Sequence, residues 1–318
     1  MTDPNNLDPP IKIPKHYPTS TLDKLTFLLH NVADQLIHLV IEYNGHLDFA
    51  LLKKAIKISL DIEPILGCKF VDHPKNPYWI RREDLDQIDY CSLVESVNIE
   101  KKLREFVFED IDPTKDPLFQ FRIFRSETDT LCFKVNHVIM DGGGIKEYLS
   151  LIINIYTSLE KEQSFEAIPN ISGSRGFDQV LRKFGLFKKF VLFLKNRAPK
   201  PSWCFPWSGI NKTNKNYIIH RFFPERFRRI KQYGKERGAT INDMLVTAYY
   251  RAMFKIVKPR PGEPMVSVVT VNLRSYLKNF RAESVCNLST GVYPNIAYNP
   301  EDSFDDTLKK VKKIMDEI

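Results

Sequence analysis

A histidine and an aspartate lie four residues apart in the middle of the chain, where an apolar run meets three glycines. The segment reads Asn136-His137-Val138-Ile139-Met140-Asp141 and continues into Gly142, Gly143 and Gly144. Imidazole exchanges protons near neutral pH and can take one from a hydroxyl, an amine or a thiol. A single histidine in a strand is more often part of a core, so the function depends on the elements around it. We predict that His137 is a general base.

Two strands and a helix are predicted to hold this segment. Residues 119–125 and 130–136 read as strands, joined by a turn over 126–129. After the glycines, apolar residues recur at helical spacing: Ile145, Tyr148, Leu149, Ile152, Tyr156 and Leu159. We therefore expect residues 142–144 to form a strand-to-helix turn, with His137 at a strand end above a helix N-terminus.

Further elements are predicted on both sides of the motif. Upstream we expect a strand over 35–43, a helix from Asp48 to Leu60 and a strand over 68–71. Downstream we expect a strand over 217–223, a helix over 240–256, a central strand over 265–272 and a helix from Ser303 to the last residue. Thr240 with Asp243, and Ser303 with Asp306, are placed to cap the two helices. The buried face predicted for the first of them comprises Ile241, Leu245, Ala248, Tyr249, Ala252 and Ile256.

Length and composition predict a two-lobed protein. A chain of 318 residues exceeds what one core usually organises. We predict a disordered leader over 1–20, an N-terminal lobe over 21–160, a linker over 161–207 and a partial C-terminal lobe over 208–318. The linker contains an amphipathic stretch over 180–200 with seven basic residues and no acidic one. That stretch is typical of a helix docked on the protein, and also of one on an anionic membrane surface.

Charge and cysteine content narrow the class of protein. Basic residues exceed acidic ones by 47 − 39 = +8, which favours anionic ligands, an acidic carrier protein or a membrane surface. The scattered cysteines predict reduced thiols and a cytoplasmic protein: Cys68, Cys91, Cys132, Cys204 and Cys286. The N-terminus lacks the apolar core of a signal peptide, and no apolar run reaches the about 18 residues of a membrane span. No motif for binding nucleic acid is present.

The run from Asn136 to Gly142 resembles the His-His-x-x-x-Asp-Gly motif of a superfamily of acyltransferases. That superfamily contains chloramphenicol acetyltransferase, the condensation domains of nonribosomal peptide synthetases, wax ester synthases and alcohol acetyltransferases. Other stretches are similar to family segments in the expected order: Gly45 to Asp48 with Glu63 to Leu66, Thr240 to Asp243, Val271 to Arg274, and Asn287 to Asn295. The resemblance implies a two-lobed α/β fold like that of chloramphenicol acetyltransferase. The chain stops inside a predicted helix, so we expect its second lobe to be incomplete.

The resemblance also assigns roles to residues. His137 corresponds to the catalytic histidine, while Asp141 is structural and pairs with Arg274. Gly142 keeps the backbone clear where a thioester arm passes, and Asn136 replaces the first histidine, as a structural hydrogen-bonding residue. Substrate-binding positions are Gly143, Asn272 and Ser289.

The implied reaction is acyl transfer from coenzyme A or a carrier-bound pantetheine to an alcohol or amine. The acyl thioester is then a substrate, and no permanently bound cofactor is expected. The alternative is a noncatalytic member of the same fold that binds a carrier protein or an acylated ligand. A metal site is not expected, because the other histidines show no ligand spacing. Phosphate-loop and serine-nucleophile motifs are also absent.

Overall fold

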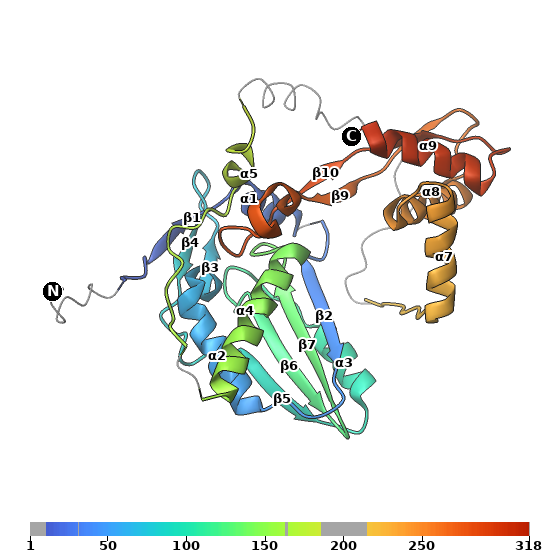
Figure 1. The fold of residues 1–318 in the computed structure, drawn as a ribbon. Coiled ribbons are helices and arrows are strands. Elements are labelled where there is room, and N and C mark those ends of the chain that lie inside the picture. The colour runs from blue at the N-terminus through green and yellow to red at the C-terminus, as the bar shows by residue number, and fades with distance from the viewer. Residues whose placement is uncertain (1–10, 31, 163–164, 186–214, 318) are drawn as a thin grey trace, which may run out of the picture. The chain divides into compact units, whose positions relative to one another are not determined.

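The computed structural model describes residues 11–30, 32–162, 165–185 and 215–317. The chain forms two compact units (Figure 1). The first unit comprises residues 1–185 and 272–289, and the second comprises residues 186–271 and 290–318. Residues 272–289 thus pack with the first unit, whereas the sequence placed them in the second lobe.

A four-stranded sheet forms the centre of the first unit. Its strand order is β2 (Leu36–Glu42), β7 (Asp129–Asn136), β6 (Phe119–Arg125) and β5 (Cys91–Glu95). The β2–β7 and β6–β7 pairs are antiparallel, and β5 runs parallel to β6. The predicted strands over 35–43, 119–125 and 130–136 are confirmed. Because β7 is buried on both faces along most of its length, its end is a rigid place for a side chain.

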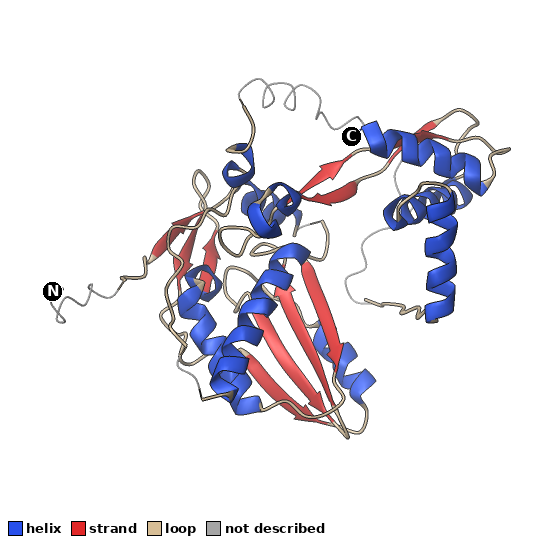
Figure 2. Cartoon of the chain, viewed as in Figure 1, coloured by secondary structure: helices blue, strands red, loops and turns tan. Residues whose placement is uncertain are grey.

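Helices cover both faces of this sheet (Figure 2). α2 (Phe49–Ile62) and α4 (Gly142–Glu160) pack on one face, over a core that includes Phe119, Phe133 and Tyr148. α3 (Ile99–Phe108), which the sequence analysis missed, buries Phe106 against the other face. The predicted start of α2 is confirmed, since the Asp48 carboxylate accepts a hydrogen bond from the Leu51 amide at 2.9 Å.

The glycines after the motif belong to α4 itself and do not form a separate turn. Asp141 is the N-cap, and its side chain accepts a hydrogen bond from the Gly144 amide at 2.8 Å. A Cβ on Gly143 would lie 2.5 Å from Arg274 Nη1, and one on Gly144 would lie 2.8 Å from the Cys286 carbonyl oxygen. The second and third glycines are therefore explained by the close approach of residues 274 and 286 to the helix.

A second, three-stranded sheet contains part of the predicted leader. β1 (His16–Pro18) pairs with β4 (Tyr78–Arg81), which pairs with β3 (Cys68–Val71), all antiparallel. The strand predicted over 68–71 is confirmed. The disordered leader over 1–20 is wrong for residues 16–20, because main-chain pairing with β4 orders a stretch whose composition is polar and proline-rich. Residues 1–10 lie outside the described part of the chain.

The predicted linker is divided. Residues 165–185 pack on the first unit, where the short helix α5 (Asp178–Leu181) buries Val180 against Cys286 and Leu288. Most of the basic amphipathic stretch over 180–200 lies outside the described residues, which resume at 215. Among the described residues, no helix is long and apolar enough to cross a membrane.

The described residues of the second unit include three long helices and short strands. The helices are α7 (Pro224–Glu236), α8 (Ile241–Val257) and α9 (Phe304–Glu317). The strands form two pairs: β8 (Pro264–Val266) is antiparallel to β11 (Asn295–Ala297), and β9 (Val269–Asn272) pairs with β10 (Ser289–Val292). Both predicted capping boxes are confirmed, at Thr240 with Asp243 and at Ser303 with Asp306.

Three predictions for this unit are wrong. Residues 217–223 form no strand, and they have no partner strand among the described residues. The strand over 265–272 is split into β8 and β9, each in a two-stranded pair and not in the centre of a sheet. The buried face of α8 was also misplaced: Leu245, Tyr249 and Ile256 are 65%, 46% and 50% exposed, while Tyr250 is fully buried. α8 is apolar on more than one face, so its pattern alone did not show which face α9 covers.

Candidate functional site

His137 lies immediately after β7, half-buried, and is fixed by its backbone and by its ring. Its amide donates to the Gln35 carbonyl at 2.7 Å. Its ring nitrogen Nδ1 lies 2.9 Å from Asn287 Oδ1. Asn287 is itself held, since its Nδ2 donates to the carbonyls of His137 and Val138 at 2.8 and 3.1 Å.

The Asn287 amide determines which nitrogen of the imidazole carries the proton. Both backbone contacts are carbonyl acceptors, so the NH₂ group of Asn287 must face them and its oxygen must face the ring. An oxygen accepts only from a protonated nitrogen, so His137 Nδ1 is the N–H donor. Among the described residues no hydrogen-bond partner reaches Nε2, which is the nitrogen that carries the lone pair when the ring is neutral and Nδ1 is protonated.

Asp141 and Arg274 form the buried ion pair that the sequence predicts. Arg274 Nη1 donates to the two carboxylate oxygens of Asp141 at 2.9 and 3.1 Å, and the residues are 2% and 5% exposed. Arg274 Nε is also 3.0 Å from Glu147 Oε1, an ion pair without hydrogen-bond geometry. Because Asp141 also caps α4 and accepts from the Leu288 amide at 2.8 Å, all of its bonds are structural.

One short segment, residues 284–288, contacts the motif both directly and through two arginines. The Val285 carbonyl accepts from Arg175 and the Cys286 carbonyl accepts from Arg274. Asn287 binds the His137 ring, and the Leu288 amide binds Asp141. Four consecutive residues therefore bind either the motif or an arginine that contacts it. This placement explains why residues 272–289 belong to the first unit.

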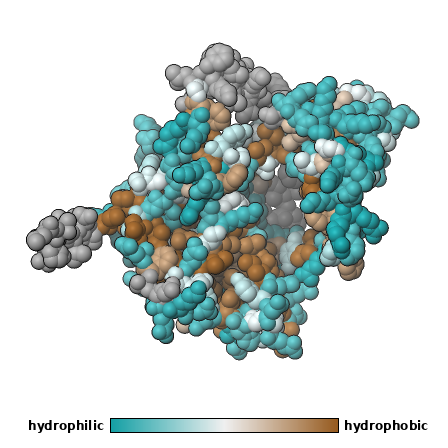
Figure 3. Space-filling model, viewed as in Figure 1, coloured by the Kyte–Doolittle hydropathy of each residue, from teal (hydrophilic) through white to brown (hydrophobic). Residues whose placement is uncertain are grey.

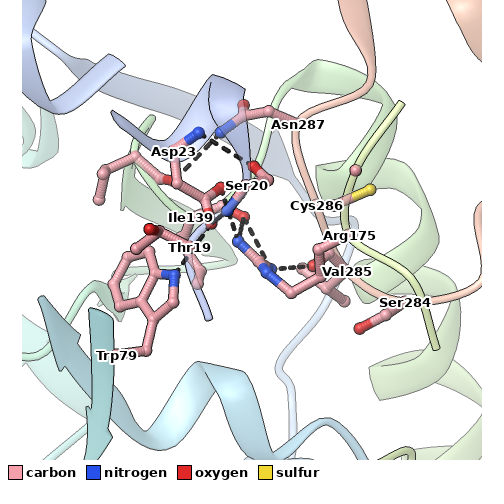
Figure 4. A network of polar contacts seen from close by, with 12 residues as sticks. Thr19, Ser20, Asp23, Trp79, Ile139, Arg175, Ser284, Val285, Cys286 and Asn287 are labelled. Carbon is pink, nitrogen blue, oxygen red and sulfur yellow. Dashed lines mark hydrogen bonds and ion pairs between the residues drawn. The ribbon is translucent and has the colours of Figure 1, made fainter. Parts of the chain in front are cut away.

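Arg175 is a second arginine behind the motif, with a side chain that is 9% exposed, and the sequence did not indicate it (Figure 4). Its guanidinium donates to the Ile139 carbonyl at 3.3 to 3.4 Å, to the Val285 carbonyl, and to Asp23 Oδ1 at 2.9 Å. Asp23 is fully buried and also accepts from Trp79 Nε1 at 2.9 Å. Arg175 thus joins helix α1 (Thr21–Leu29), the motif and the segment 284–288.

Asn136 has the structural position expected for it. It is 3% exposed, its Nδ2 donates to the Ile111 carbonyl at 3.0 Å, and its Oδ1 accepts from the Val138 amide at 3.0 Å. Both polar groups of the side chain bind backbone. Asn136 therefore holds the turn that follows β7 and contains His137.

The other residues predicted at the site, for the thioester arm or for substrate binding, lie in three kinds of surroundings. Gly142 is exposed, and a Cβ there would meet nothing within 4 Å, whereas Gly143 lies against Arg274. Asn272 accepts from the Arg274 amide at 3.1 Å and caps a 3₁₀ turn, η2 (Leu273–Tyr276). Ser289 is half-buried at the start of β10. Gly143 and Asn272 both lie beside Arg274, the partner of Asp141.

The described residues contain no group of histidines, cysteines or acids arranged to hold a metal ion. The four described cysteines are free and buried: Cys68, Cys91, Cys132 and Cys286. Cys204 lies outside the described residues. The site is therefore built from an imidazole, amides and buried ion pairs.

Comparison with known proteins finds similarity to one family. Residues 16–172 match the family model described as Condensation domain. This part of the chain, which contains the motif, is therefore similar to condensation domains. Bacitracin synthase 3 of Bacillus licheniformis is 22% identical to it over 251 residues, which are 74% of this chain and 4% of that much longer protein. The chain thus spans only a small fraction of the length of this curated relative.

Solved structures of condensation domains share the fold. The first condensation domain of the calcium-dependent antibiotic synthetase, in complex with a substrate analogue, superposes with a TM-score of 0.69 at 15% identity, covering 96% of this chain and 75% of that chain. Polyketide synthase associated protein 5 from Mycobacterium tuberculosis gives 0.67 at 14% identity, covering 95% and 71%. A mutant starter condensation domain of rhizomide synthetase, in complex with C8-CoA, gives 0.67 at 11% identity, covering 95% and 71%. The predicted mixed α/β condensation-domain fold is confirmed.

Proposed function

We propose that this protein transfers an acyl group from a thioester to an alcohol or an amine, with His137 as the general base. The donor is an acyl-coenzyme A or an acyl group on a carrier-bound pantetheine. The observation that carries the proposal is the contact of His137 Nδ1 with an amide oxygen whose orientation is fixed by two carbonyls. That contact leaves Nε2 as the basic atom at a half-buried position.

The reaction needs one proton to move twice. Nε2 takes the proton of the acceptor hydroxyl or amine as its oxygen or nitrogen attacks the thioester carbonyl carbon. The tetrahedral adduct then collapses, the carbon–sulfur bond breaks, and the leaving thiolate takes the proton from the imidazolium. The products are an ester or amide and a free thiol, and the enzyme forms no covalent intermediate.

Other features support a thioester donor. The relative solved in complex with C8-CoA has this fold. The net charge of +8 favours the phosphates of coenzyme A or an acidic carrier protein. The exposed backbone at Gly142, with open space where a side chain would stand, leaves room for an extended arm near the motif.

Free-thiol release tests the proposal. The full chain is incubated with a panel of acyl-coenzyme A donors and acyl-carrier proteins, with mixed small alcohols and amines, beside His137→Ala. We expect release that depends on the acceptor and falls by about 10² to 10⁴ in the variant. His220→Ala, a change at an exposed histidine, is the matched control and should leave the rate unchanged. If folded wild-type protein binds donors but releases no thiol, the protein is a binding module.

Substitutions of Asn287 test the positioning of the ring. Asn287→Ala removes the hydrogen bond to the ring, worth about 1 kcal/mol, together with the two bonds that orient the amide, so we expect kcat to fall at least roughly fivefold with little change in KM. Asn287→Asp keeps an acceptor for Nδ1 but loses both donors to the carbonyls of residues 137 and 138. A rate for Asn287→Ala equal to that of wild type would show that the contact does not orient the catalytic ring.

A further inference from the structure

Glu63 is a half-buried carboxylate at the end of α2 that the proposed reaction does not use. Its side chain accepts hydrogen bonds from two segments that lie far along the chain. Oε1 accepts from Asn170 Nδ2 at 2.9 Å, and Oε2 accepts from Ser284 Oγ and from the Val285 amide at 2.8 and 3.3 Å. The end of α2 is thus joined to residues 284 and 285, at the start of the segment that contacts the motif.

The neighbours of Glu63 require a hydrogen-bond acceptor at this position. Asn170 Nδ2 also donates to the Glu283 carbonyl at 2.8 Å, and Asn170 Oδ1 accepts from the Gly173 amide at 3.1 Å. The second hydrogen of the Asn170 NH₂ group must therefore point at Glu63. The Val285 amide is likewise only a donor. A carboxylate satisfies all of these donors, because both of its oxygens accept.

Burial makes the Glu63 carboxylate costly to hold in place. Figure 3 shows brown, apolar side chains over the part of the first unit where α2 and α4 run. Removal from water raises the pKa of Glu63, because this effect is larger than the opposite effect of its three hydrogen bonds and of the charge of Arg175. Carboxylates with a perturbed pKa are typical of functional sites.

The segment that Glu63 holds leads directly to the ring of His137. Both backbone polar groups of Val285 are bound, the amide by Glu63 and the carbonyl by Arg175 (Figure 4). Two residues later, Asn287 Oδ1 contacts His137 Nδ1. Two residues of chain span at most about 7 Å, so a displacement of Val285 is passed on to Asn287.

We propose that Glu63 is a positioning residue, which holds residues 284 and 285 so that the Asn287 oxygen meets Nδ1 of His137. The inference rests on the proposed function and adds a determinant of its general base: the neutral ring protonated at Nδ1. The effect of Glu63 on the ring passes through Asn287.

The effect of removing Glu63 is expected to be local. Arg274 and Asp141 hold the far side of the segment, at the carbonyl of residue 286 and the amide of residue 288. These bonds remain when Glu63 is changed. We therefore expect Asn287 to shift while the rest of the segment stays bound.

Nuclear magnetic resonance of the histidine nitrogens tests the proposal without substrate. The full chain, isotopically labelled at these nitrogens, is measured at pH 8, where an ordinary imidazole is neutral. Comparison with His137→Ala assigns the signals of His137. We expect wild type to carry this proton on Nδ1. In Glu63→Ala the ratio of the Nδ1-protonated to the Nε2-protonated ring should fall about fivefold, as for the loss of one hydrogen bond to the ring.

Two further variants complete the test. Ser284→Ala removes only the hydroxyl donor, so the ratio should fall in the same direction by less than in Glu63→Ala. Asp243→Ala is the matched control, because this 5%-exposed carboxylate in the second unit accepts from the Thr240 amide and hydroxyl, both at 2.8 Å. It loses a similar set of bonds and should leave the ratio for His137 unchanged.

Several outcomes would overturn the proposal. A ratio unchanged in Glu63→Ala, or lowered equally in Asp243→Ala, would show that Glu63 does not position the ring. If Glu63→Ala does not fold, a ratio unchanged in Ser284→Ala gives the same answer. An Nε2-protonated ring in wild type would contradict the role of Asn287 as well.

The same variants separate this proposal from the proposed catalysis. A ratio that depends on Glu63, in a protein that releases no thiol, would support the positioning role and contradict the catalysis. Where wild type releases thiol, kcat of Glu63→Ala should fall up to about fivefold with KM unchanged. Thiol release that needs His137 but proceeds at the wild-type kcat in Glu63→Ala would contradict the positioning role alone.

Discussion

Arg274 and Arg175 bind neighbouring carbonyls of the same segment, but they have different kinds of partner. Arg274 pairs with two carboxylates, Asp141 and Glu147, and donates to the Cys286 carbonyl. Arg175 pairs with one carboxylate, Asp23, and donates to two carbonyls, of Ile139 and Val285. Their side chains are 2% and 9% exposed. Both arginines connect segments that are distant in the sequence.

The two arginines support the motif in different ways. The Arg274 pair acts on the motif through a charged side chain of the motif itself. Arg175 acts mainly on backbone oxygens and on a carboxylate in α1, so it fixes the position of a loop without touching a motif side chain. A carboxylate is costly to bury without a partner, and Arg274 serves two of them. We therefore expect the structure to depend more on Arg274.

Removal of Arg274 should have the largest effect. Arg274→Ala leaves Asp141 and Glu147 without their cation, so we expect a loss of about 3 to 5 kcal/mol in the free energy of unfolding, measured by urea denaturation. The control is Arg228→Ala, at an exposed arginine that pairs with Glu225, which should cost at most about 1 kcal/mol. An Arg274→Ala protein as stable as that control would show that the ion pair is not structural.

Arg175→Ala should cost less, about 1.5 to 3 kcal/mol in the same measurement. Only one carboxylate loses its partner, and Asp23 still accepts from Trp79 Nε1 and the Ser20 amide at 2.9 and 3.0 Å. We also expect slower thiol release, because the loop after His137 loses a donor to the Ile139 carbonyl. If Arg175→Ala proves more destabilising than Arg274→Ala, then Arg175 contributes more to the stability of the structure than Arg274, contrary to our expectation.

Alanine substitutions at two neighbouring glycines test how closely Arg274 packs against the motif, because Gly143 lies against Arg274 and Gly142 lies in open space. Gly143→Ala places a methyl group 2.5 Å from Arg274 Nη1, and we expect it to cost about 1 to 3 kcal/mol. Gly142→Ala meets nothing within 4 Å and should leave stability unchanged or raise it by about 0.4 to 1 kcal/mol. The melting temperatures of the two variants are compared. Equal melting temperatures would show that the Arg274 side chain moves to accommodate the methyl group of Gly143→Ala.

The reactivity of the Cys286 thiol tests how firmly residues 284–288 are held, and we expect the smallest effect here. Burial raises the pKa of its thiol to about 12, because this effect is larger than the opposite effect of the nearby positive charges of Arg175 and Arg274. At pH 8 the folded protein therefore holds Cys286 as an unreactive thiol, whereas an unfolded cysteine, with a pKa of about 8.5, is partly thiolate. We expect mass spectrometry after brief iodoacetamide treatment to find Cys286 unmodified in wild type.

Alkylation of Cys286 should also rank the two arginine variants. Modification should be faster in Arg274→Ala than in Arg175→Ala, because Arg274 binds the carbonyl of this same residue. It should increase in every variant as the pH rises toward 12. Rapid modification of wild type at pH 8 would show that residues 284–288 detach readily from the motif.

The sequence was sufficient to predict several elements and one of the contacts around the motif. The strands that deliver His137, the caps at Asp48, Thr240 and Ser303, and the pairing of Asp141 with Arg274 all agree with the structure. Caps and strand patterns involve residues close in sequence, and the ion pair followed from a family resemblance. These signals do not require knowledge of the packing.

Long-range packing decided the rest. Asn287 lies 150 positions from His137, and Arg175 lies 152 positions from Asp23, with no spacing that connects either pair. The buried face of α8 depends on α9, and the orientation of α1 depends on a carboxylate that an isolated helix would expose. By itself, the sequence determined which side chain can accept a proton. Only the tertiary structure decided which ring nitrogen of His137 contacts Asn287 and which face of α1 is buried, because both depend on hydrogen bonds and contacts between segments far apart in the chain.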